Sequence, residues 1–535
     1  MSDSTTRIAA VMSRKTFLRG VGAFGAAALA SKVGLFSGAA WAQEQPEGQS
    51  GGILAYNLTG DPPNFDPLSA TSSTVMCVIG PCYNGLVRFD PQSPQSIIGD
   101  LAPTWDISED GKSYTFHLVQ NAKFHDGKPM TSADVQYTFD TIRNPPEGTV
   151  SSRKKLLAEV TSIGAPDDYT VVFNLGRPSP SFLTSMASCW MLVMPKHILE
   201  VKGHMKEDIV GTGPFKLQQI SQGVSYELVK NPDYFVPNRP YLDGITAYVI
   251  PDSGTTWNYL QNGQLQIMIS IQGQDAGSFK SGGNVEVLEQ PSTSFIGINF
   301  NTKAAPFDDV RVRQALSVGV DRNAALNVTY NGQGQLGGIA VPGQWALPDD
   351  QLTTVPGYGP DGAANIEEAK RLLAEAGFPD GFDVKVLVRK NPLFEPVGVF
   401  LKDQWAKLGV NATIDIQENA AYAEAISSKN YSVSASGASY ALEDPDSVFG
   451  DDSFCGVNEC SAVIEDLFAK QAVEMDPAKR LALVNQLELE LAKEYSIYVM
   501  YWRNRFMGIT TNVRGMKLHP NIDQNLRMDQ VWLDA

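Results

Sequence analysis

The sequence predicts an α/β protein with more than one domain. Alternating strand patterns and amphipathic helix patterns follow one another along its 535 residues, a length that suits two to four domains. The composition, with 43% hydrophobic and 19% charged residues, is ordinary for a globular chain. A net charge of −17 disfavours nucleic acid and anionic membrane surfaces as partners. We expect a monomer.

The first 42 residues are predicted to be a signal peptide. Residues 13–19 resemble the twin-arginine export motif, except that Lys15 stands where a second arginine is usual, so ordinary secretion stays open as an alternative. The Gly/Ala-rich run that follows is too short and too weakly apolar for a membrane span, which needs about 20 apolar residues. Small residues around Trp41 predict cleavage between Ala42 and Gln43. We therefore expect an exported, soluble, periplasmic protein.

A strand, a turn and a capped helix are predicted between residues 99 and 143. Residues 113–118 alternate between polar and apolar side chains, which is typical of a half-buried strand. Asp-Gly dipeptides on both sides of this strand favour tight turns, because glycine accepts a positive φ without strain. Thr131 and Asp134 have the spacing of a capping box, and apolar residues at helical spacing follow them.

The same signals predict the other main elements. Strands are expected at residues 53–58, 171–175 and 295–300. Five helices are expected from their caps and apolar faces: residues 71–86, a helix that starts after Asp308 or Asp309, residues 366–376 after Asn365, a helix that closes at Gly409, and residues 477–494 after Asp476.

Several short motifs resemble those of the family 5 extracellular solute-binding proteins, which are the peptide, nickel and oligosaccharide receptors of ABC importers. In chain order they are LAPTW, DGKSYTFHL, KFHDG, ADV, GTGPFKL, NPDY and LDGI, between residues 101 and 245. One departure is the pair Val119-Gln120, where the family has two basic residues. The resemblance extends over nearly the whole chain after residue 42.

This resemblance implies a two-lobed, hinged periplasmic-binding-protein fold of type II, with an extra domain inserted in the first lobe. The ligand is expected between the lobes. The implied segments are 1–42 for the signal peptide, 43–88, 208–300 and 500–535 for the first lobe, 89–207 for the inserted subdomain, and 301–499 for the second lobe.

The resemblance also implies a function. The protein is expected to capture a peptide-like solute and to deliver it to an inner-membrane ABC permease, without catalysis and without a cofactor. An oligosaccharide, an opine-type conjugate or a nickel chelate is an alternative ligand. An exported hydrolase is the alternative of another class, although the only G-x-S-x-G match, at residues 48–52, has no strand before it.

Four residues are candidates for contact with the ligand. In family members that bind peptides, an aspartate in an Asp-Pro-Asp loop neutralises the ammonium group, and an arginine pairs with the carboxylate. Asp444 and Arg389 occupy the matching positions, and a zwitterion that leaves water needs partners for both charges. The alternative is that Asp444 only caps a turn and that Arg389 is a surface charge. Trp345 and Tyr440 are candidate aromatic walls, or else core residues.

The cysteines and histidines indicate little further chemistry. Cys455 and Cys460 are close enough along the chain for a short disulfide loop. Cys77 and Cys82 fall in one predicted helix, where about 7.5 Å of rise disfavours a bond between them. The five histidines form no metal-binding motif, so no metal site is expected.

Overall fold

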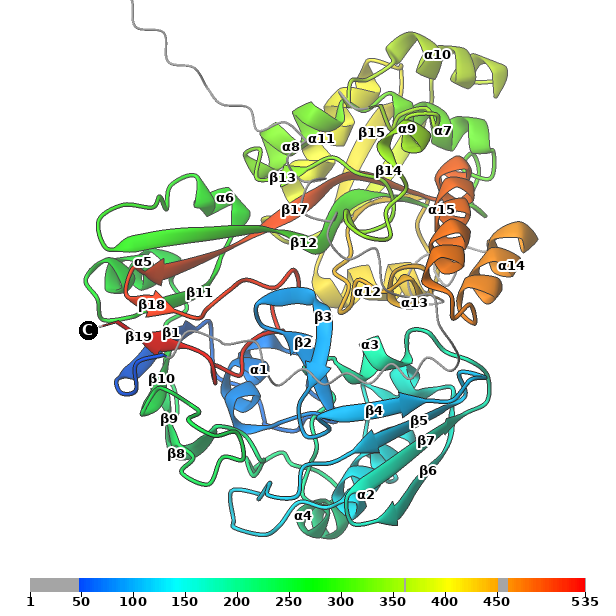
Figure 1. Cartoon of the computed structure of the whole chain (residues 1–535). Helices are drawn as coiled ribbons and strands as arrows, with labels where there is room; N and C mark the ends of the chain where they lie inside the picture. Colours follow the sequence, from blue (N-terminus) through cyan, green and yellow to red (C-terminus); the bar gives the residue numbers. More distant parts are fainter. Residues whose placement is uncertain (1–47, 360–361, 451–459, 535) are drawn as a thin grey trace, which may run out of the picture. The chain divides into compact units, whose positions relative to one another are not determined.

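The computed structural model describes residues 48–359, 362–450 and 460–534 (Figure 1). The predicted signal peptide, the predicted cleavage point between Ala42 and Gln43, and Cys455 lie outside these residues. Within them, every helix is too short or too polar to cross a membrane.

A large mixed sheet organises the described chain. It has 11 strands, and two of them, β12 (Val285–Phe300) and β17 (Ile497–Thr510), pair antiparallel along most of their length. The remaining strands extend the sheet on both sides of this pair, with β13 beside β17. These are β15 (Asn411–Gln417), β14 (Asp383–Arg389) and β16 (Val433–Ser436) on the β12 side, and β11 (Ile267–Ile271), β1 (Ile53–Leu58), β10 (Gly244–Val249), β9 (Ser225–Lys230), β8 (Phe215–Ser221) and β13 (Gly334–Gln335) on the β17 side.

The other strands of the described residues form three smaller sheets. A four-stranded sheet has the order β4 (Thr104–Ile107), β5 (Ser113–His117), β7 (Thr170–Leu175), β6 (Val160–Asp167). Helix α2 (Ser132–Arg143) packs on β6 and β7. The two-stranded sheets are β2 (Val87–Asp90) with β3 (Ser93–Gly99), and β18 (Val513–Arg514) with β19 (Trp532–Leu533).

The helices lie between these strands in the sequence. The first, α1, spans Ser73–Ile79 and runs into a 3₁₀ turn, η2 (Gly80–Cys82). The others are η3 (Lys154–Leu157), α3 (Phe182–Met186), α4 (Lys196–Lys202), α5 (Ser253–Gln261), α6 (Gly273–Ala276), α7 (Val310–Val318), α8 (Arg322–Tyr330), α9 (Asp349–Leu352), α10 (Ile366–Glu375), α11 (Glu395–Ala406), α12 (Asn419–Ser427), α13 (Pro445–Phe449), α14 (Ala462–Gln471) and α15 (Pro477–Glu494).

The predicted caps are confirmed. Thr131 and Asp134 form the capping box of α2, and the side chains of Asp309, Asn365 and Asp476 accept backbone N–H groups at the starts of α7, α10 and α15. Each cap satisfies donors that have no partner inside their helix. The local sequence therefore determines where these helices begin.

The predicted helix at residues 71–86 is wrong in its length. The side chain of Ser72 caps α1, but the α-helix ends at Ile79. Pro81 follows within two residues, and a proline has no N–H to continue the helical hydrogen bonds. Cys77 and Cys82 are both free thiols, so they form no disulfide with each other.

The buried apolar residues separate into two main clusters. One gathers residues between 54 and 269 with residues 507–531, and the other gathers residues 295–502. We call these parts the first lobe and the second lobe. Strands β12 and β17 belong to both, because one half of the pair adjoins β11 and the other half adjoins β16. The predicted lobe boundaries near residues 300 and 500 remain a proposal, which this division supports.

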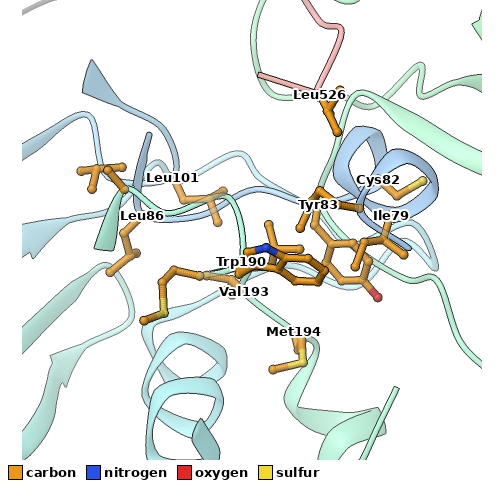
Figure 2. Close-up of a cluster of buried hydrophobic side chains, with 14 of the residues drawn as sticks. Ile79, Cys82, Tyr83, Leu86, Leu101, Trp190, Val193, Met194 and Leu526 are labelled. Carbon is orange, nitrogen blue, oxygen red and sulfur yellow. The ribbon is translucent and has the colours of Figure 1, made fainter. Parts of the chain in front are cut away.

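The core of the first lobe joins distant parts of the sequence. Figure 2 shows Tyr83 and Ile79 together with Trp190, Val193 and Leu526. Because Leu526 packs here, the C-terminal segment is attached to the same lobe as β1 and α1.

Candidate functional site

A cavity of about 180 Å³ lies where the two lobes meet. Phe89, Gln95 and His519 line it from the first lobe, and Trp345 and Asp444 line it from the second. Aromatic walls with a few polar groups are typical of a site for a small ligand.

Asp444 is held by a buried ion pair on one side of this cavity. Its carboxylate oxygens accept hydrogen bonds from Arg480 at 2.8 and 3.0 Å, and the side chains of both residues are about 95% buried, at 5% and 4% exposed. Asp444 also caps α13 by accepting the backbone N–H of Asp446 at 3.0 Å. The carboxylate thus has a full set of partners in the absence of any ligand.

Trp345 extends the same arrangement. The Arg480 guanidinium carbon lies 5.0 Å from the centroid of the Trp345 ring, which is within the range of a cation–π contact. Trp345 therefore is an aromatic wall of the cavity, and it also supports the cation that neutralises Asp444.

Asp446 connects the second lobe to the first. It accepts a hydrogen bond from the Ser181 hydroxyl, which belongs to the first lobe, and another from Gln471 Nε2 at 2.6 Å. Burial, and then the neighbouring charge of Asp444, raise the pKa of its carboxyl. Asp444 and Asp446 border a second interlobe cavity, of about 490 Å³, together with Arg177.

Arg389 lies at the end of β14 in a different cavity. Its guanidinium carbon lies 4.9 Å from the Phe394 ring centroid and 5.2 Å from that of Tyr422. Its Nε is buried without a hydrogen-bond partner, and within the described residues no carboxylate pairs with it. Arg389 and Tyr422 line a cavity of about 540 Å³ in the second lobe. An unpaired guanidinium between two rings is suited to a carboxylate from outside the chain.

Tyr440 lies between the two regions. Its ring is 5% exposed and lines the Arg389 cavity. Its backbone carbonyl accepts hydrogen bonds from Thr293 Oγ1 at 2.7 Å and Asn521 Nδ2 at 3.2 Å, and these two residues line the interlobe cavity of Trp345. The ring packs mainly in the core, against Phe295 and Trp502.

The four predicted residues therefore form two pairs. Asp444 and Trp345 share one cavity, and Arg389 and Tyr440 share another. The structure does not bring Asp444 and Arg389 into one cavity.

The sequence analysis did not single out Arg480. Arg480 lies one turn before Val484 on the apolar face of α15. An arginine on an apolar helix face indicates a buried cation, and a buried cation needs a carboxylate partner. This pattern could have identified Arg480 from the sequence. Of the predicted disulfide pair, Cys460 is disulfide-bonded, and Cys455 lies outside the described residues. Among the described residues, no group of three or more His, Cys, Asp and Glu side chains is arranged to hold a metal ion.

Comparisons with known proteins identify the family of the chain. The family described as bacterial extracellular solute-binding proteins, family 5 Middle, matches residues 96–458. The dipeptide-binding protein of Escherichia coli (strain K12) is 29% identical, over 87% of this chain and 92% of the relative. Heme-binding protein A of Haemophilus influenzae is 30% identical, over 69% of this chain and 71% of the relative.

Solved structures share the fold. That of the periplasmic binding protein AgaA in complex with agropinic acid, from A. tumefacien R10, has a TM-score of 0.74 and 26% identity, over 90% of this chain and 99% of that one. The DppA protein of Helicobacter pylori in complex with the peptide STSA has a TM-score of 0.73 and 24% identity, over 91% and 99%. The fold is thus the two-lobed type II periplasmic-binding-protein fold.

Proposed function

Because this chain belongs to the bacterial extracellular solute-binding proteins of family 5, we propose that it captures a peptide-like solute and delivers it to an ABC permease. Relatives named as dipeptide-binding and oligopeptide-binding proteins support this ligand class. The proposed place of action is the periplasm, after export by a twin-arginine signal, and the proposed activity is binding without chemical change.

The observation that carries the proposal is the unpaired guanidinium of Arg389. It lines a cavity with aromatic and hydroxyl side chains, and its Nε has no internal hydrogen-bond partner. Leaving a buried polar group unpaired costs free energy, so a ligand carboxylate would bring a gain that the protein alone does not supply. We propose Arg389 for the carboxylate end of the solute, and Tyr440 as the wall beside it.

A negatively charged loop lies beside the interlobe cavity that Trp345 lines. We propose that the loop with Asp444, next to Trp345, binds the part of the ligand that carries positive charge. The buried pair of Asp444 with Arg480 fixes this loop. A zwitterionic solute would then contact both cavities through the region of Tyr440.

An opine-type conjugate is the second candidate ligand. The AgaA structure, which is 26% identical, holds agropinic acid, and such a ligand would also use a guanidinium partner for its carboxylate. Thermal unfolding with three ligand pools separates the classes: tripeptides, opine-type conjugates and neutral oligosaccharides. The proposal expects the peptide pool to raise Tm, as any ligand does that binds only the folded state. A rise with oligosaccharides alone would contradict it.

A further inference from the structure

We propose that one part of the first lobe latches the two lobes together when they close. This part is the four-stranded sheet β4–β7 with helices α2 and α3, residues 104–186, and we call it the four-stranded unit. The latch consists of two contacts with the second lobe: the hydrogen bond from Ser181 to Asp446, and the packing of Met475 against Gly111. The inference goes beyond the proposed binding function, because the latch is made of contacts within the chain and does not depend on which ligand is bound.

Ser181 is held in place by the packing of its own lobe. It directly precedes α3, whose first residue, Phe182, packs on the four-stranded sheet. The Phe182 ring centroid lies 4.6 Å from that of Tyr114 on β5 and 5.5 Å from that of Phe173 on β7. Ser181 is 6% exposed, and its hydroxyl donates to the Asp446 carboxylate of the second lobe. The unit therefore presents this donor to the second lobe from a packed position.

Asp446 is held in place independently by the second lobe. Gln471 of α14 donates to its Oδ1 at 2.6 Å, and Arg480 of α15 lies 3.5 Å from the same oxygen. The other oxygen, Oδ2, is the one that accepts from Ser181. A hydrogen bond to an ionised carboxylate is stronger than one between neutral groups. Because donor and acceptor are each ordered by their own lobe, little side-chain entropy is lost when they meet.

The second contact of the latch is apolar. Met475 lies in the loop between α14 and α15, and Gly111 lies in the turn between β4 and β5. The Met475 side chain packs so closely on this turn that a β-carbon at position 111 would come within 3.1 Å of its sulfur. Gly111 has a φ of +66°, a conformation that favours glycine, and the missing side chain leaves room for Met475. The two lobes thus touch at two separate places along the unit.

The charges at this interface also favour closure. Arg177, just after β7, lies within electrostatic reach of Asp446, and both line the interlobe cavity of about 490 Å³. In Figure 1, α13 and α14 of the second lobe lie above α3 and the four-stranded sheet. Since all these contacts join residues of the chain itself, they stabilise the closed arrangement with any ligand and also without one. The free protein should therefore occupy the closed arrangement for a measurable part of the time.

The test is small-angle X-ray scattering of the free protein, which measures its radius of gyration. Ser181→Ala removes the hydrogen bond, and Met475→Ala removes the apolar contact from the other lobe. Both variants should have a larger radius of gyration than wild type, because loss of a hydrogen bond to a charged group shifts the ratio of open to closed protein by about tenfold. Ser185→Ala is the matched control, since Ser185 lies on α3, is 8% exposed and lines the same cavity. It should leave the radius unchanged.

Titration calorimetry with two tripeptides, Ala-Leu-Ala and Gly-Ser-Gly, separates a latch from a ligand contact. A latch changes only the population of the closed arrangement, so Ser181→Ala should weaken the binding of both peptides by the same factor, of up to about tenfold. Ser185→Ala should bind both peptides as wild type does. A loss confined to one of the two peptides would show that Ser181 acts on the ligand, and it would overturn the latch.

The scattering result also separates the latch from the proposed function. An equal radius of gyration in wild type, Ser181→Ala and Met475→Ala would overturn the latch and leave peptide binding intact. If neither tripeptide binds wild type, peptide binding fails, but scattering still decides the latch because it needs no ligand. If circular dichroism shows that Ser181→Ala is partly unfolded, the radius of Met475→Ala decides, since that variant leaves Ser181 and Asp446 in place.

Discussion

Arg480 and Asp444 form a buried ion pair whose strength can be measured. Arg480→Met would leave the Asp444 carboxylate without a cation in a site where both side chains are about 95% buried. Removal of one partner of such a pair typically costs about 3–5 kcal/mol, so we expect a loss of that size in the free energy of unfolding, measured with urea. The exposed pair of Lys493 and Glu490 is the control: Lys493→Met should cost about 1 kcal/mol or less. Equal losses of unfolding free energy in the two variants would contradict the burial of the Asp444–Arg480 ion pair.

His519 should make the protein less stable in acid. Its pKa is lowered from 6.5 to about 4 in the folded state, by desolvation first, so the unfolded chain binds a proton more readily between these values. Stability from the neutral ring is fully present above about pH 6.5 and is lost as the pH falls toward 4. His519→Gln should reduce this acid-induced loss of stability by roughly 2–3 kcal/mol. The loss is measured as the difference between the free energies of unfolding in urea at pH 7 and at pH 4. If the free energy of unfolding of variant and wild type changed with pH in the same way, the lowered pKa of His519 would be refuted.

At the scale of elements, one carboxylate holds the loop that carries Trp345. Glu488 of α15 is fully buried and accepts the backbone N–H groups of Ala340 at 2.9 Å and Leu347 at 2.6 Å. Glu488→Leu would leave both donors without a partner, at a cost of about 1–3 kcal/mol each. We expect faster hydrogen exchange across residues 336–347 and weaker ligand binding. Glu490→Leu, two residues along the same helix at a partly exposed position, is the matched control. Unchanged exchange in the loop would show that Glu488 does not fix it.

The sequence was informative about elements and less so about contacts between them. The capping box of α2 and the Asp476 cap of α15 use donors within three residues, so their motifs specify them. The pair of Asp444 with Arg480 spans 36 residues, and no local pattern determines which acid meets a buried arginine. For the same reason the motif indicated the Asp444 loop but not the separate cavity of Arg389.

At the scale of the molecule, strands β12 and β17 are shared by the two lobes. Motion between lobes would therefore have to bend this pair, whose register shifts between Pro291 and Phe295. Cavities with Asp444 and Trp345 lie between the lobes, and residues of both lobes line them. Asp444 and Trp345 thus lie where closure of the two lobes would enclose a solute, whereas the cavity of Arg389 lies within the second lobe.

We propose that each chain captures one solute molecule and releases it chemically unchanged. Native mass spectrometry of protein purified without denaturation, then incubated with the tripeptide Ala-Leu-Ala, tests it most directly. We expect one added peptide mass per protein, and recovery of the intact tripeptide after the protein is unfolded. Recovery of hydrolysed peptide, or a protein that stays without any peptide at saturating concentration, would contradict it.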